Sequence, residues 1–147
     1  MKREDQLTEI VRLFYKCSAA DEELQTKHGI GDLGLVYRPR PGGFSLSEKS
    51  RAYLAEARDV GKPLEGYLNG LSESELAQIE AIMYFGRDHE GVHGNDLTWL
   101  RKHLEQNRSG VSDLVRNISE KCNALPLYFS EALQKADKEG IDLNQEF

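Results

Sequence analysis

Residues 72–86, SESELAQIEAIMYFG, decide the fold of this chain. The first four letters fit the capping box, in which the Ser72 hydroxyl accepts a backbone N–H bond and the Glu75 side chain returns one. Behind this start, apolar residues at helical spacing form one broad face: Leu76, Ile79, Ile82, Met83 and Phe85. We therefore predict a central, buried helix that starts at Ser72 and that Gly86 terminates.

Working outward, the same periodicity predicts helices on both sides of this one. Those before it span about residues 5–26, 47–58 and 64–69. Ser45 or Ser47 caps the second of these. After the central helix, Asn95 or Asp96 caps a helix over 97–104, and Ser112 caps the next. The last helix starts at Leu125-Pro126, because proline suits a first helical position, and Gly140 closes it.

These elements predict an all-α fold: one domain over 1–147, in which six to seven helices form an orthogonal or bundle-like array. Residues 28–44 interrupt it with a loop rich in glycine and proline. Inside this loop Leu35-Val36-Tyr37 suits one short strand or a hairpin edge, but a lone strand cannot satisfy its backbone without a partner. We therefore expect a loop there.

Composition fits a folded domain in water. Of 147 residues, 39% are hydrophobic and 30% are charged, which excludes both a disordered chain and a membrane protein. No apolar run has the length of a membrane span, and the first residues lack the apolar segment of an export signal. We expect a cytoplasmic protein in which Cys17 and Cys122 are buried free thiols, the alternative being a disulfide between them.

The formal net charge is −6, and the whole acidic excess lies in residues 71–147. A nucleic-acid-binding domain would instead show a clustered basic face. The balance argues against general nucleic-acid binding and is compatible with a basic protein partner.

The densest polar segment is 87–96, RDHEGVHGND. Its letters His89-Glu90-Gly91-Val92-His93 satisfy His-Glu-x-x-His, in which a helix places both imidazoles on zinc and the glutamate beside the attacking water. His103 is a candidate third ligand. Glycines at 91 and 94 instead favour an interhelical turn, so we expect no metal or cofactor and keep zinc, with Glu90 as general base, as the alternative.

A second polar feature is the extended segment Tyr37-Arg38-Pro39-Arg40-Pro41. Arginine beside proline occurs where proteins enter a nucleic-acid groove. Arg38 and Arg40 can equally pair with carboxylates of this chain or of a protein partner. We expect a structured loop, with nucleic-acid contact as the alternative.

The stretch 71–88, LSESELAQIEAIMYFGRD, resembles a family of small uncharacterised bacterial proteins, a domain of unknown function marked by a capped helix ending in an aromatic-Gly-Arg step. The resemblance implies a small helical bacterial protein and carries no activity or catalytic residues. Arg87 follows the glycine of that step, where it could meet an anion or a buried carboxylate.

From these observations we predict a non-enzymatic interaction protein, such as a regulator, an inhibitor or an immunity-type binder. Its expected partner is another protein, and a homo-oligomer is left open. Candidate contact residues are Arg38, Arg40, Arg87, Glu131 and Asp137. We place Glu131 and Asp137 with Glu139 and Asp142 in an acidic patch on the final helices.

Overall fold

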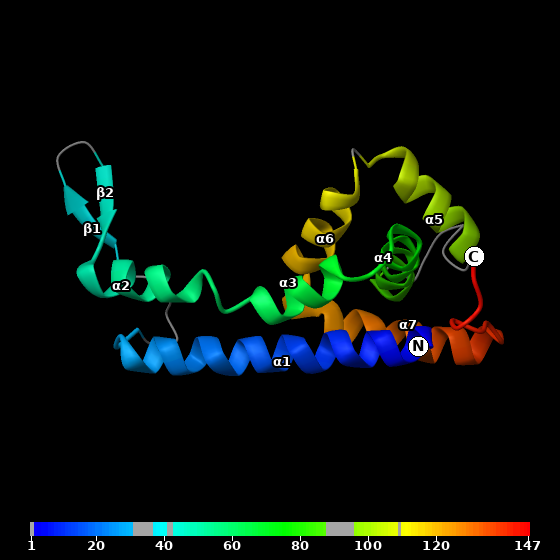
Figure 1. The fold of residues 1–147 in the computed structure, drawn as a ribbon, viewed down its shortest axis with the longest axis horizontal. Helices are drawn as coiled ribbons and strands as arrows, with labels where there is room; N and C mark the ends of the chain where they lie inside the picture. The colour runs from blue at the N-terminus through cyan, green and yellow to red at the C-terminus, as the bar shows by residue number, and fades with distance from the viewer. Residues whose placement is uncertain (1, 31–36, 41–42, 88–95, 109) are drawn as a thin grey trace. The chain divides into compact units, whose positions relative to one another are not determined.

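The computed structural model describes residues 2–30, 37–40, 43–87, 96–108 and 110–147. Most of these residues are helical, which confirms the all-α class (Figure 1). The elements within these ranges are α1 (Arg3–Lys27), β1 (Tyr37–Arg40), β2 (Gly43–Leu46), α2 (Glu48–Ala57), α3 (Lys62–Asn69), α4 (Glu73–Arg87), α5 (Leu97–Gln106), α6 (Val111–Glu120), the short 3-10 helix η1 (Cys122–Ala124) and α7 (Leu125–Glu139). None of the described helices is both long and apolar enough to cross a membrane.

The chain divides into two compact units. Unit 1 comprises Met1–Arg12 and Leu64–Phe147, and unit 2 comprises Leu13–Pro63. Helix α1 contributes to both, its first turns to unit 1 and the remainder to unit 2. A single folding domain therefore stays a prediction.

Helix α4 is the centre of unit 1, as its sequence predicts. It packs against α5, α6 and α7, and every side chain from Leu76 to Met83 is buried. Figure 1 shows α4 nearly end-on while α7 lies across the view, so the two helices cross steeply, as in an orthogonal array. Because α4 is enclosed on most sides, the polar side chains of Gln78 and Glu80 are buried too and need partners.

The capping box of α4 is confirmed. Ser72 Oγ accepts from the Glu75 backbone N–H at 3.1 Å, and Glu75 Oε1 accepts from the Ser72 N–H at 3.0 Å. Two other predicted caps form, by Ser47 on α2 and by Asp96 on α5. The cap predicted at Ser112 is wrong, because α6 begins at Val111 behind Gly110.

Gly86 has a different role from the predicted one. It lies inside α4, and its φ is not among the positive values found at Gly29 and Gly140. A Cβ built on Gly86 would lie 1.8 Å from the Tyr128 carbonyl oxygen of α7. Glycine is required at position 86 because the backbones of α4 and α7 are in contact there and leave no room for a side chain. Helix termination does not explain it.

Unit 2 corrects the prediction for 28–44. Strands β1 and β2 form an antiparallel hairpin in which Arg38 pairs with Ser45 and Arg40 pairs with Gly43. The sequence argument failed because it considered Leu35-Val36-Tyr37 without a partner, whereas Gly43–Leu46 supplies a partner for β1. In a two-stranded hairpin each strand is an edge, which tolerates Pro39.

The rest of unit 2 is held by polar contacts between α1 and α2. Tyr53 donates to Asp21 Oδ1, and Lys27 Nζ lies 2.9 Å from Glu56 Oε1. Cys17, on α1, is a free thiol but is half-buried rather than fully buried as expected, and the Cys122 side chain lies outside the described part of the chain.

Candidate functional site

Of the predicted metal ligands, only His103 lies among the described residues. His89, Glu90 and His93 lie outside the described residues, so the zinc alternative stays a prediction. His103 lies on the exposed side of α5, where its ring stacks on Trp99 with centroids 4.7 Å apart and planes 9° apart. Among the described residues no group of three histidine, cysteine or carboxylate side chains is placed to hold a metal ion.

The predicted arginine contacts are separate features. Arg38 and Arg40 lie on β1, and their side chains are outside the described part of the structure. Arg87 is the last described residue of α4, with its guanidinium carbon 4.4 Å from the centroid of the Tyr84 ring. Arg87 thus contacts an aromatic face, a cation–π arrangement.

Glu131 and Asp137, the predicted acidic contacts, lie on α7. Asp137 is exposed and Glu131 is half-buried. The same helix exposes two leucines, Leu127 at 60% and Leu133 at 37%. The helix also carries Lys135 and the exposed Lys138, so its surface combines apolar, acidic and basic side chains.

A cleft of about 580 Å³ lies where the start of α5 meets the segment that follows α7. Three exposed carboxylates line it, those of Asp96, Asp142 and Glu146. Its remaining lining residues are Leu97, Thr98, Gly140, Ile141, Gln145 and Phe147. Among the described residues that line the cleft there is no lysine or arginine, so this part of the lining is acidic with apolar parts.

Local structure after α7 builds one wall of this cleft. Gly140 adopts φ 70°, a left-handed helix end, and Ile141 N–H bonds to Ala136 O at 2.8 Å. Leu143 is then buried to 1% exposure. The anchored leucine leaves its neighbours Asp142 and Asn144 exposed.

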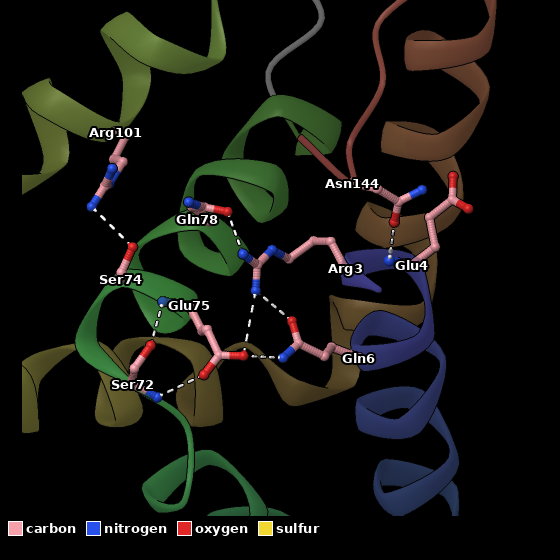
Figure 2. Close-up of polar contacts among 9 residues, drawn as sticks. All are labelled: Arg3, Glu4, Gln6, Ser72, Ser74, Glu75, Gln78, Arg101 and Asn144. Atoms are coloured by element: carbon pink, nitrogen blue, oxygen red, sulfur yellow. Dashed lines mark hydrogen bonds and ion pairs between the residues drawn. The ribbon is translucent and has the colours of Figure 1, made fainter. Parts of the chain in front are cut away.

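Further contacts hold this segment in place. The Glu4 backbone N–H donates to Asn144 Oδ1 at 3.1 Å, and Arg101 Nη1 donates to the Phe147 carbonyl at 2.6 Å (Figure 2 shows the first). On the opposite wall, Asp96 Oδ1 accepts from Trp99 N–H at 2.9 Å, and the residue is exposed. The cleft is therefore built on anchored backbone.

A buried ion pair lies elsewhere in unit 1. Arg108 Nη2 and Glu80 Oε1 are 2.7 Å apart, with side chains 7% and 5% exposed. Asn117 Nδ2 donates to the other Glu80 oxygen at 2.8 Å and to Tyr84 Oη at 3.1 Å. This network joins α4 to α6 and to the segment between α5 and α6, which fits a structural role.

A second polar network joins α1 to α4 (Figure 2). Arg3 donates to Gln6 and to Gln78, and it lies 3.9 Å from Glu75 Oε2. Gln6 donates to the same Glu75 oxygen. The Ser72 backbone N–H is the largest cause that lowers the pKa of Glu75, and the Gln6 amide and Arg3 lower it further.

Comparisons with known proteins identify no relative: no family model, no curated protein and no solved structure matches this chain.

Proposed function

We propose that this chain is a bacterial, cytoplasmic, non-enzymatic protein that binds a basic segment of a protein partner in the acidic cleft. The observation that carries the proposal is the cleft lining, in which the described residues combine Asp96, Asp142 and Glu146 with apolar residues and include no lysine or arginine. The acidic excess of residues 71–147 supports the same sign of partner charge.

Both the acidic and the apolar residues of the lining are suited to binding lysine and arginine side chains. Their ammonium and guanidinium groups pair with carboxylates, while their alkyl stems pack on apolar surface. Ile141 and Phe147, both half-buried, supply that surface among the lining residues. A basic segment therefore satisfies the cleft better than an acidic or a purely apolar one.

We expect the three carboxylates of the cleft to determine which partner binds more than how tightly it binds. All three carboxylates are exposed, and an exposed ion pair contributes about 0.2–1 kcal/mol. Complementary charge chiefly accelerates encounter and rejects partners of the wrong sign. We expect binding that weakens as salt rises.

The test uses fluorescent peptides of equal length, one rich in lysine and arginine and one rich in glutamate. The native protein should bind the basic peptide and not the acidic one. Replacing two carboxylates, Asp142→Asn with Glu146→Gln, should weaken binding about two- to thirty-fold, the loss of two exposed ion pairs. The matched control Glu22→Gln with Glu23→Gln removes two exposed charges from α1 and should leave binding unchanged.

A further pair of substitutions separates the cleft from α7. If Glu131→Gln with Asp137→Asn weakens binding and the cleft variant does not, the partner binds α7 and the cleft proposal is wrong. Equal binding of both peptides by the native protein would also contradict it.

A further inference from the structure

One exposed face of α5 combines a carboxylate with two aromatic rings. Asp96 caps this helix, and Trp99 and His103 follow at intervals of three and four residues, a spacing that places side chains next to one another on a helix surface. Asp96 and His103 are exposed, and Trp99 is 36% exposed. The three residues therefore form one stripe along α5 that a partner can reach.

This stripe begins in the acidic cleft. Asp96 belongs to the cleft lining, together with Thr98. The Trp99 backbone N–H donates to Asp96 Oδ1 at 2.9 Å, so the carboxylate is fixed against the first turn of the helix that carries the indole ring. Residues three apart on a helix have Cβ atoms about 5–6 Å apart. A long side chain that pairs with Asp96 is therefore within reach of the Trp99 ring.

The Trp99 ring already carries a flat polar group on its face. The His103 imidazole lies nearly parallel to it, with ring centroids 4.7 Å apart and planes 9° apart. A guanidinium group is also flat, stacks on indole in the same way and has a positive charge that the ring face attracts. The ammonium group of lysine is compact and strongly hydrated, so it gains less from a flat surface. A carboxylate beside a tryptophan therefore favours arginine over lysine.

We propose that Asp96 and Trp99 form an arginine-selective subsite at the rim of the cleft, with Trp99 as the specificity-determining residue. This proposal rests on the function proposed for the cleft and names the side chain that the basic segment of the partner must carry. The Asp96 carboxylate pairs with the guanidinium group, which stacks on the indole. Because His103 is exposed, its side chain can turn aside and leave its place on the ring to the guanidinium group.

The test uses two fluorescent peptides of equal length and equal positive charge, one with arginine and one with lysine as its only basic residue. The native protein should bind the arginine peptide about two- to five-fold more tightly, the gain from one exposed cation–π contact. Trp99→Leu should bind both peptides equally. The matched control Tyr15→Leu removes an exposed aromatic ring from α1 and should keep the preference. Because the readout is a ratio within each variant, a partial loss of folded protein lowers both affinities alike.

Trp99 gives a second readout, because it is the only tryptophan of the chain. Its emission should change as the arginine peptide saturates the native protein, and change less with the lysine peptide. If the native protein binds both peptides equally while Asp142→Asn with Glu146→Gln still weakens both, the cleft proposal holds and the arginine subsite is overturned. If neither peptide binds, the cleft proposal fails as well. A preference that is kept in Trp99→Leu, or lost in His103→Ala, would also overturn the subsite.

Discussion

The backbone of Gly86 in α4 lies directly against the carbonyl of Tyr128 in α7, so closely that a Cβ on Gly86 would be 1.8 Å from the carbonyl oxygen and 3.0 Å from the Ala132 nitrogen. These atoms belong to main chain and cannot rotate away. The α4–α7 crossing at the centre of unit 1 therefore depends on the absence of a side chain at one position.

Gly86→Ala should separate the two helices. We expect the free energy of unfolding to fall by about 1–3 kcal/mol or more, the usual cost of overpacking a core. Gly66→Ala is the matched control, because a Cβ there meets nothing within 4 Å, and it should leave α3 unchanged or up to about 1 kcal/mol more stable. Urea unfolding of both variants measures this, and equal effects would contradict the account.

The pair of Glu80 and Arg108 should behave as a buried unit. Arg108→Met leaves the Glu80 carboxylate, 5% exposed, without its cation and should cost about 3–5 kcal/mol. Replacing Glu80 by methionine as well should recover part of that loss, and a double-mutant cycle by urea unfolding measures the coupling. Arg116→Met, which removes an exposed pair with Asp113, should cost at most about 1 kcal/mol. Simple addition of the Glu80 and Arg108 effects would refute the coupling.

The capping carboxylate of Glu75 should make stability depend on pH. Its folded pKa lies below the unfolded value of about 4.3, so its contribution is present above that pH and is lost as pH falls through the folded pKa. Glu75→Gln should cost about 0.5–1 kcal/mol at neutral pH, a modest value for a side chain that is 36% exposed, and almost nothing in acid.

The control Glu73→Gln removes a carboxylate from the same turn and keeps the capping box. Thermal unfolding of both variants and of the native protein across acidic pH makes the comparison. A difference between native and Glu75→Gln that stays constant down to the lowest pH would contradict the assigned contacts.

Features that depend on near neighbours in sequence could be predicted. The Ser72 capping box needs residues three apart, and the apolar face of α4 follows from helical periodicity. Features that depend on a distant partner could not. Residues 37–40 were predicted as loop because their partner strand β2 carries no periodic signal. Gly86 was predicted as a helix end because the backbone that requires glycine at this position belongs to α7.

The residues of the acidic cleft were likewise only partly predicted from the sequence. Asp142 was predicted within an acidic patch, but the sequence grouped it with Glu131 and Asp137 rather than with the start of α5. Asp96 was recognised as a cap and as the end of the polar segment 87–96, and Glu146 was missed. Nothing local indicates that the segment after α7 returns to α5, because this depends on the turn at Gly140 and the burial of Leu143.

The claim that the acidic cleft binds a basic segment is tested most directly by mapping backbone amide shifts while the lysine- and arginine-rich peptide is added. The account predicts that the largest changes fall on Leu97, Thr98, Ile141, Asp142 and Glu146, which line the cleft. Changes centred on the exposed face of α7 around Leu127 and Leu133, with the cleft amides unmoved, would contradict it.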